Sequence, residues 1–400
     1  MMWHFFSPKV FYGEGSLAAF ENIPGKKCFI VTDNTLEELG YLKILTDVLD
    51  KFGKEFRVFK DVIPDPHEDD VMKGKEDCNK FAPDLIIALG GGSVMDTAKV
   101  VWAMYEYPSF TIDDINFNNP ELFNFAKKAK FIAIPTTSGT GSEATWAAIV
   151  SQYKNGVWRK GSFAHESLVP TYAIVDPIFP SGMPQKLTIS TAFDALSHSF
   201  EAYISAWRNE FSNALVPKAI ELIFKYLPVA FKEGNNMEAR DFLHQAATMA
   251  GIAFSNSQVH IVHALGHSFA AIFPFPHGSL VGLFLPYVLQ YCINAPGDTN
   301  EAIQLYSELA KKLGWAKWED EDKKAANIVL EKIKELQKLV EFPTSLKDLG
   351  IEREEFEKHL GALISLCYQD PSGVMAPRSP SKDDFSRLYT YAYDGKEIDF

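Results

Sequence analysis

The spacing of apolar residues changes near Pro180, and the halves of the chain on either side of it cannot fold alike. Between about residues 27 and 176, short apolar runs alternate with helical patterns, which predicts buried strands at 27–32, 55–59, 84–89 and 131–134. Strands that alternate with helices form a parallel sheet covered on both faces. We therefore expect an α/β domain with a doubly wound parallel sheet at residues 1–180.

The second half carries long helical periodicity and few β-branched runs. The pattern predicts helices at 186–206, 212–227, 237–271, 279–293, 299–313, 320–338 and 353–367. We therefore expect an all-helical domain at residues 181–400.

Charge and cysteine content exclude several classes of partner. The formal net charge is −13, and a surface so negative repels the phosphates of nucleic acid and of anionic lipid. The chain has no apolar run of roughly eighteen residues, so we expect no membrane span. The four cysteines lack paired spacing, which argues against a disulfide scaffold and fits a reducing compartment. We therefore expect a cytoplasmic protein.

Glycine-bearing turns follow two of the predicted strands. Gly90-Gly91-Gly92-Ser93 follows the strand at 84–89, and the segment 136–143, rich in hydroxyls and glycine, follows the strand at 131–134. Glycine lets backbone amides approach a phosphate, and the following helix N-terminus adds partial positive charge. The spacing matches neither the GxGxxG nor the Walker pattern. A single turn of this kind is equally well explained as a tight connection between a strand and a helix, with no ligand. Two of them favour a bound nucleotide.

Four of the ten histidines lie within one short stretch, His260, His263, His267 and His277. The first three are spaced i, i+3 and i+7, which places them on one face of the helix predicted at 237–271.

A second constellation lies on the helix predicted at 186–206. Asp194 and His198 are four residues apart, and Glu201 extends the same face by another turn. A carboxylate and a histidine on an apolar helix are costly to bury without partners, and a divalent metal with nitrogen and oxygen ligands removes that cost. A single histidine is more often a hydrogen-bonded core or surface residue. The two constellations together favour a metal site, but spacing does not decide which histidines bind.

Taken together, these motifs resemble those of the iron-containing (group III) alcohol dehydrogenases. The resemblance covers nearly the whole chain and is carried by the segments 90–99, 135–143, 194–198, 263–267 and 276–278. Segments 86–99 and 344–350 bring it closest to the alcohol dehydrogenase half of bifunctional aldehyde–alcohol dehydrogenases, whereas the segment 370–378 departs from those relatives. The resemblance implies a dehydroquinate synthase-like fold with a dinucleotide-binding first domain and an active site in the cleft between the domains.

The resemblance also implies the roles of individual residues in the second half. It makes Asp194, His198, His263 and His277 the metal ligands, normally holding Fe(II) and sometimes Zn(II). It places His267 near the nicotinamide, where we expect this histidine to take part in the proton relay because histidine as a residue type can both donate and accept a proton near neutral pH. His260 has no counterpart in the motif, so we interpret it as a structural residue or an outer neighbour of the ligands.

In the first half, the resemblance implies a dinucleotide site. Asp33 ends the first strand, where a carboxylate would accept from the ribose hydroxyls and repel the extra phosphate of NADP(H), so we expect NAD(H). Asp33 also suits the N-cap of the next helix. The remaining residues implied are Gly91, Gly92 and Ser93 at the pyrophosphate, Thr136, Thr137 and Thr140 on the adenosine and phosphate side, and Asp65 and Lys160 at the border of the cofactor.

The implied reaction is hydride transfer between NAD(H) and a small aliphatic alcohol or aldehyde, with the metal polarising the substrate oxygen. Trp146, Phe254, Phe269 and Phe273 suggest an apolar pocket, although each also suits a core position. The resemblance further implies a homodimer or larger homo-oligomer. Two alternatives remain: a dehydroquinate synthase-like lyase, which needs a basic lining for its anionic substrate, and a non-catalytic filament or assembly subunit, which needs no intact ligand set.

Overall fold

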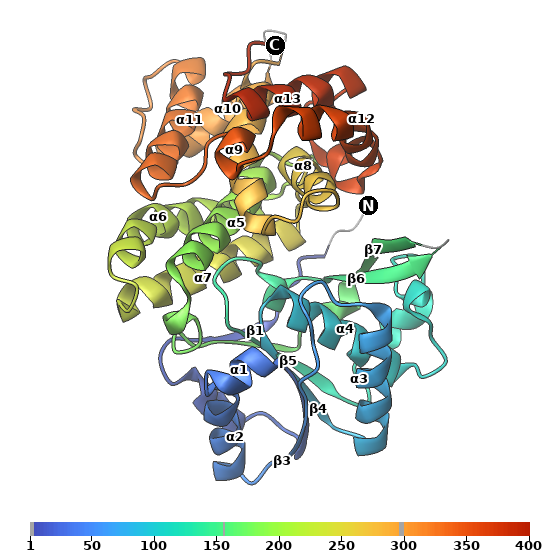
Figure 1. Ribbon diagram of the computed structural model, residues 1–400. Helices are drawn as coiled ribbons and strands as arrows, with labels where there is room; N and C mark the ends of the chain where they lie inside the picture. Colours follow the sequence, from blue (N-terminus) through green and yellow to red (C-terminus); the bar gives the residue numbers. More distant parts are fainter. Residues whose placement is uncertain (1–3, 155–156, 296–299) are drawn as a thin grey trace. The chain divides into compact units, whose positions relative to one another are not determined.

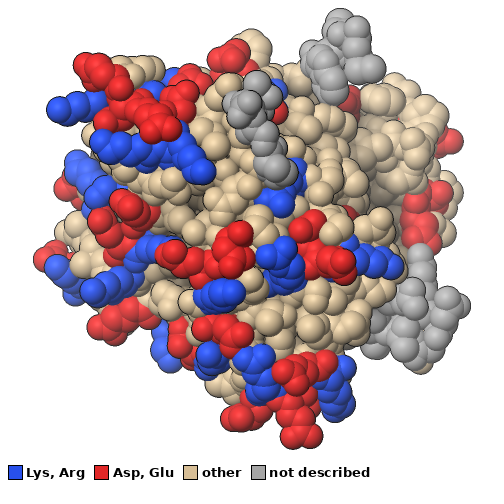
Figure 2. Space-filling model, turned by 90° about the horizontal axis from the view of Figure 1, so that it is seen from above, with Lys and Arg blue, Asp and Glu red and all other residues tan. Residues whose placement is uncertain are grey.

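The computed structural model describes residues 4–154, 157–295 and 300–400, and the chain divides into two compact units, Met1–Gly182 and Met183–Phe400 (Figure 1). Figure 2 shows Lys and Arg side chains interspersed with Asp and Glu over the left and lower parts of the face in view, while the rest of that face is mostly uncharged.

A six-stranded parallel sheet forms the centre of the first unit, in the order β1-β8-β5-β4-β2-β3. The four predicted strands are present, and the two short strands at one side of the sheet were not predicted. The strands are β1 (Lys9–Tyr12), β2 (Lys27–Val31), β3 (Glu55–Phe59), β4 (Leu85–Gly90), β5 (Lys130–Pro135) and β8 (Tyr172–Val175).

Helices cover both faces of this sheet because the side chains of its central strands alternate between two apolar clusters. Phe29, Ile86 and Phe131 point toward α3 (Glu68–Phe81) and α4 (Gly92–Glu106), whereas Ile30 and Ile87 point toward α2 (Tyr41–Lys51). A short helix, α1 (Asn34–Glu38), follows β2. The doubly wound arrangement predicted from the sequence is thus confirmed.

The first unit also contains an antiparallel hairpin that was not predicted, formed by β6 (Ala147–Lys154) and β7 (Val157–Ala164). It follows a 3-10 turn, η4 (Ser142–Ala144), which overlaps the end of the second glycine-bearing segment. The hairpin therefore continues from the turn that ends β5.

The second unit is helical throughout the residues described in it, as predicted. The α5 helix is buried from Thr188 to Ile204, and α6, α7, α9 and α10 pack against it (Figure 1). Of the described helices, none is both long enough and apolar enough to cross a bilayer. The helices are α5 (Gln185–Ile204), α6 (Glu210–Lys232), α7 (Met237–Ser255), α8 (Ile261–Ala270), α9 (His277–Ile293), α10 (Glu301–Lys312), α11 (Asp322–Leu339), α12 (Arg353–Gln369) and α13 (Lys382–Asp394).

The single helix predicted at 237–271 was wrong, because α7 and α8 are separate helices. Gln258, between them, has φ of 76°, a left-handed conformation that interrupts a helix. The break is held by side chains from elsewhere, since Asn209 donates to the backbone carbonyl of Asn256 and Ser205 donates to that of Ser257. His260 is consequently the N-cap residue of α8 and does not share a helical face with the two histidines that follow it.

Candidate metal centre and cofactor cradle

Three helices of the second unit approach closely because glycines lie where they meet. A Cβ atom on Gly278 of α9 would lie 2.2 Å from the backbone oxygen of Ser190 and 3.3 Å from the Cβ of Asp194 on α5. On α8, Gly266 meets α9 in the same way, since its Cβ would lie 2.7 Å from a methyl group of Val281. Only glycine allows such distances, and the close approach brings the first turn of α9 next to Asp194.

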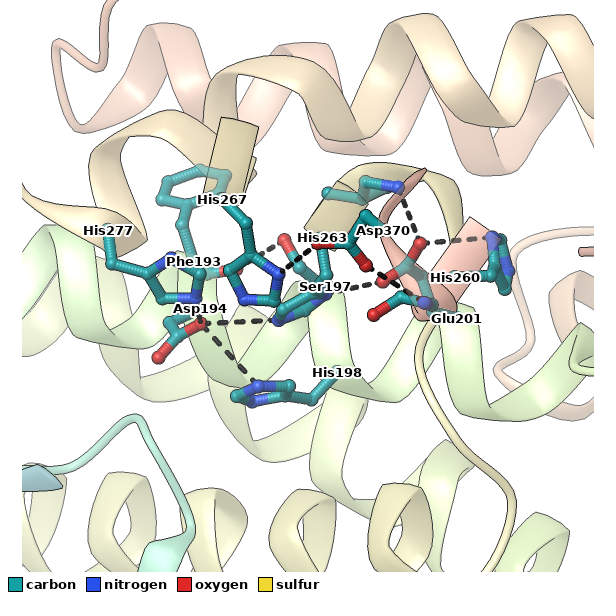
Figure 3. A network of polar contacts seen from close by, with 12 residues as sticks. Phe193, Asp194, Ser197, His198, Glu201, His260, His263, His267, His277 and Asp370 are labelled. Atoms are coloured by element: carbon teal, nitrogen blue, oxygen red, sulfur yellow. Dashed lines mark hydrogen bonds and ion pairs between the residues drawn. The ribbon is translucent and has the colours of Figure 1, made fainter. Parts of the chain in front are cut away.

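Three imidazole rings converge on one carboxylate oxygen in this region (Figure 3). The Nε2 atoms of His198, His263 and His277 lie 3.6, 3.8 and 3.5 Å from Oδ1 of Asp194. Asp194 and His198 share one face of α5, His263 comes from α8, and His277 is the first residue of α9. The structure therefore brings together all four residues implied as ligands, here called the metal centre: Asp194, His198, His263 and His277.

The chemistry of this donor set fits a divalent metal ion. Oδ1 of Asp194 and Nε2 of His263 are buried and have no hydrogen-bond partner among the described residues. One ligand atom each from Asp194, His263 and His277 lie within 4.8 Å of one another. Buried polar atoms without partners are costly, and imidazole nitrogen with carboxylate oxygen suits iron or zinc. The residues present thus fit the metal that the sequence motifs implied.

The charge of Asp194 suits a ligand role. Burial by itself raises the pKa of Asp194, but His198, His277 and His263 outweigh burial and hold the pKa below its ordinary value. The carboxylate is therefore ionised at neutral pH, the form that binds a cation.

Glu201 contacts His263 of the metal centre at Nδ1, the ring nitrogen that does not face Asp194. This carboxylate is fully buried, and its Oε2 lies 2.5 Å from Nδ1 of His263. Its Oε1 accepts a hydrogen bond of 2.6 Å from the backbone N–H of Val262 and lies 3.0 Å from Nδ1 of His260. A carboxylate that accepts at Nδ1 fixes the ring so that Nε2 is left for a metal, which is the usual outer arrangement around a ligating histidine. His260 thus lies against Glu201.

His267 lies beside the metal centre, and its ring stacks on that of His277 with 5.2 Å between the ring centroids. Its Nδ1 is 3.1 Å from Oδ2 of Asp370. Sequence reasoning missed Asp370, because its N-cap pattern before Pro371 indicates only a turn, and the two partners are 103 positions apart.

The aromatic residues expected to line a pocket have different surroundings. Phe254 stacks on His198, with ring centroids 4.2 Å apart, and so borders the metal centre. Phe269 and Phe273 are buried and stack on each other, which makes them part of the helical core. Trp146 belongs to the first unit.

In the first unit, the two glycine-bearing turns lie side by side because β4 and β5 are neighbours, with Gly90 opposite Pro135. A Cβ on Gly91 would lie 3.3 Å from the methyl group of Thr137, and one on Gly92 would lie 3.3 Å from that of Thr140. The second turn thus packs on the N-terminus of α4, where backbone N–H groups favour an anion. Six of the nine residues implied at the cofactor are together here: Gly91, Gly92, Ser93, Thr136, Thr137 and Thr140.

A buried lysine that the sequence reasoning did not assign ties the two turns together. Nζ of Lys99 on α4 donates to Ser142 Oγ at 3.0 Å, Thr145 Oγ1 at 2.9 Å and the Ala147 carbonyl at 2.9 Å. Burial lowers the pKa of Lys99 to about 8, against the opposing effect of Asp96 and Glu143. Lys99 thus holds α4 to the segment that begins the hairpin.

Asp33 caps α1, because its side chain accepts a hydrogen bond of 3.0 Å from the backbone N–H of Leu36. The preceding residue, Thr32, donates to the carbonyl of Leu89 at 2.9 Å. The end of β2 that carries Asp33 therefore lies beside the glycine turn that follows β4.

Asp65 and Lys160 are also brought together, by an ion pair of 2.5 Å between Oδ1 and Nζ. Asp65 has φ of 52°, in the left-handed region, so its backbone is held in a form that few residues adopt. Both side chains are exposed at this pair.

Family models and known proteins match this chain over almost its whole length. Residues 7–177 match the family model described as "Iron-containing alcohol dehydrogenase", and residues 188–393 match "Fe-containing alcohol dehydrogenase family, C-terminal". The NADPH-dependent butanol dehydrogenase of Clostridium saccharobutylicum is 36% identical over 403 residues, covering 100% of each chain. The iron-containing alcohol dehydrogenase from Thermococcus thioreducens has a TM-score of 0.87 and 30% identity, covering 99% of this chain and 100% of that one.

A longer relative matches over part of its length. The bifunctional aldehyde-alcohol dehydrogenase AdhE of Escherichia coli K12 is 34% identical over 418 residues, covering 99% of this chain and 47% of the relative. This chain thus spans about half the length of that bifunctional protein.

Proposed function

Because the chain belongs to the iron-containing alcohol dehydrogenase family, we propose that its NAD(P)-dependent oxidoreduction of alcohols and aldehydes takes place at the metal centre. The observation that carries this proposal is the convergence of three Nε2 atoms on one oxygen of Asp194. Family membership favours the dehydrogenase over the lyase and the assembly subunit. When bound, Fe(II), or Zn(II) in its place, supplies Lewis-acid polarisation of the substrate oxygen, and the nicotinamide accepts or supplies the hydride.

The protein's own task at this centre is to hold charges and move a proton. Asp194 contributes the negative charge that binds the cation, and Glu201 holds the ring of His263 in place. We assign the proton transfer to His267, whose side chain is 41% exposed beside the metal centre and can therefore be reached by substrate. In alcohol oxidation the proton of the hydroxyl passes to Nε2 of His267, and in aldehyde reduction the same atom returns it.

For the cofactor, NAD(H) is proposed as the preferred form. Asp33 stands at the end of β2 beside the glycine turn, where its negative charge would repel the additional phosphate of NADP(H). The butanol dehydrogenase relative is NADPH-dependent by name. The relative and the Asp33 argument thus point to different cofactors, and kinetic measurement with NADH and NADPH decides which one this chain prefers. The other residues that support the cofactor are the six at the paired turns, with Asp65 and Lys160 at its border.

Small aliphatic aldehydes and alcohols are proposed as substrates. The ring of Phe254 stacked on His198 offers an apolar surface at the metal centre, and one full-length relative is named for butanol. We also propose that the protein works in the cytoplasm as a homodimer or larger homo-oligomer, without nucleic acid or membrane partners. Light scattering of the purified protein and fractionation of its host cells test these two points.

The deciding experiment follows NADH oxidation with butyraldehyde under anaerobic conditions. We expect chelator-stripped protein to be inactive and to recover with Fe(II), and to a smaller extent with Zn(II), because the substrate oxygen then meets a Lewis acid. Full activity in protein that contains no measurable metal would contradict the proposal.

The same assay tests the cofactor preference. Replacing Asp33 by Ser removes the charge and retains a residue suited to the N-cap of α1. We expect the ratio of kcat/KM for NADPH to that for NADH to rise by about tenfold or more, as loss of about 1.4 kcal/mol of repulsion would produce. Asp61, exposed and bridged to Asp33 through the backbone, offers the matched Asp-to-Ser control. An unchanged ratio in Asp33→Ser would count against the role of Asp33.

A further inference from the structure

The segment after α12 begins with Asp370, the N-cap residue of a short 3-10 helix, η8 (Pro371–Met375). The two oxygens of this carboxylate have separate partners. Oδ1 accepts a hydrogen bond of 2.8 Å from the backbone N–H of Ser372, and Oδ2 lies 3.1 Å from Nδ1 of His267 (Figure 3). The side chain of Asp370 is only 14% exposed, so water competes little for either oxygen.

The backbone around Asp370 is fixed at several points. The N–H of Ala206, just beyond α5, donates to the carbonyl of Met375 at 2.9 Å. Arg378 donates to the carbonyl of Tyr291 at 2.7 Å and to that of Phe400 at 3.1 Å. Because the segment is tied to the helices on either side of it, Asp370 presents its carboxylate to His267 in one orientation.

We propose that Asp370 is the positioning residue of His267, holding the proton on Nδ1 and leaving Nε2 as the nitrogen that exchanges a proton with substrate. An ionised carboxylate can only accept hydrogen bonds, so the imidazole nitrogen that faces it must be the one that carries hydrogen. The other nitrogen then has its electron pair available in the neutral ring. The same pairing prevents the ring from turning over, because the turned ring would place carbon opposite Oδ2.

The charge state of Asp370 agrees with this role. Burial alone raises the pKa of Asp370, but the hydrogen bond and charge of His267, with the N–H of Ser372, outweigh burial and hold the pKa below its ordinary value. The carboxylate is therefore ionised at neutral pH and is an acceptor throughout.

The inference rests on the proposed proton-transfer role of His267, so its test needs a readout independent of turnover. The informative variant is Asp370→Asn, since asparagine caps a helix as well as aspartate does and keeps the bond to Ser372. Its amide NH₂ group would face Nδ1 of His267 as a donor, which favours the opposite tautomer.

The first measurement is ¹⁵N NMR of histidine-labelled protein loaded with Zn(II), with the His267 signals identified by their loss in His267→Asn. We expect the wild-type ring to carry its proton on Nδ1 and the ring in Asp370→Asn to shift toward the Nε2-protonated form. A wild-type ring protonated only on Nε2 would overturn the inference, whether or not Asp370→Asn folds.

The second measurement is steady-state kinetics with metal content determined on the same samples. We expect Asp370→Asn to lower kcat by about 10- to 100-fold, part of the roughly 10²- to 10⁴-fold that a positioned proton-transfer group contributes, with metal content unchanged and KM within about twofold. Glu355→Gln is the matched control, because Oε1 of the exposed Glu355 lies 2.9 Å from Nε2 of His359 and this pair stands outside the proposed machinery. A wild-type kcat in Asp370→Asn, alongside an inactive His267→Asn, would refute the inference.

The two readouts separate the inference from the function on which it rests. Full activity in His267→Asn would overturn the proposed relay, while the tautomer change in Asp370→Asn would still support the positioning of the ring by Asp370.

Discussion

Replacing Glu201 by Gln tests how far the metal centre depends on the groups behind it. Glu201 faces three nitrogen groups, from Val262, His263 and His260, and all of them are buried with it. Glutamine has the same shape but offers one acceptor oxygen and an NH₂ group. At least one of the three nitrogen groups would then face a donor in place of an acceptor.

The magnitude follows from the burial of this carboxylate. Removing one partner of a buried charged pair costs about 3–5 kcal/mol in the free energy of unfolding, because the remaining group keeps its desolvation penalty. Since the introduced glutamine would still accept one hydrogen bond, we expect about 3 kcal/mol. Loss of an outer carboxylate weakens metal binding by about 10- to 100-fold, or about 1.4–2.7 kcal/mol in binding free energy.

Two assays measure these effects separately. Urea unfolding of metal-free protein gives the change in free energy of unfolding, and competition with a chromophoric chelator gives the dissociation constant of the metal. Glu238→Gln is the control, because Glu238 is exposed and accepts a single hydrogen bond from Tyr226. We expect the control to change stability by less than about 0.5 kcal/mol. A Glu201→Gln protein with wild-type stability and wild-type metal affinity would refute the reasoning.

Two further predictions concern other contacts. Gly278→Ala should lower the free energy of unfolding by about 1–3 kcal/mol and weaken metal binding, because the added Cβ would lie 2.2 Å from the Ser190 carbonyl oxygen and push α9 away from α5. The control is Gly361→Ala on α12, where the added Cβ has open space around it. In urea unfolding, this control should raise the free energy of unfolding by about 0.5–1 kcal/mol. Burial lowers the pKa of Lys99 to about 8, so between that pH and the ordinary lysine value of 10.5 the unfolded chain binds more protons than the folded one. The free energy of unfolding of wild type should therefore rise relative to Lys99→Met across this window, by about 3 kcal/mol in total, and a pH-independent difference would contradict the prediction.

Much of the fold could be predicted because local pattern and tertiary structure agree. The four central strands are buried apolar runs followed by turn residues, and these features need no partner to be recognised. The strands β1 and β8 have only four residues each, too few to show a period. The break between α7 and α8 contains neither glycine nor proline, and Asn209 and Ser205, which hold it, lie about fifty positions earlier in the chain.

In the candidate site, too, some features could be predicted from local sequence and others could not. Asp194 and His198 lie four residues apart on one helix, so their shared face is a local property that the sequence reveals. The contacts of Glu201 with His263 and of Asp370 with His267 join residues 62 and 103 positions apart. Such contacts depend on how the helices pack, which no local pattern specifies.

The unequal exposure of the four residues of the metal centre has a kinetic consequence. The side chains of Asp194, His198 and His263 are 4%, 6% and 3% exposed, whereas that of His277 is 38% exposed. If these residues hold an ion as proposed, we expect it to enter and leave past His277 at the start of α9, while the donors on α5 and α8 stay in place. We then expect exchange of one ion for another to require the movement of one ring and no unfolding of α5, so that the bound ion follows the supply of divalent ions around the protein.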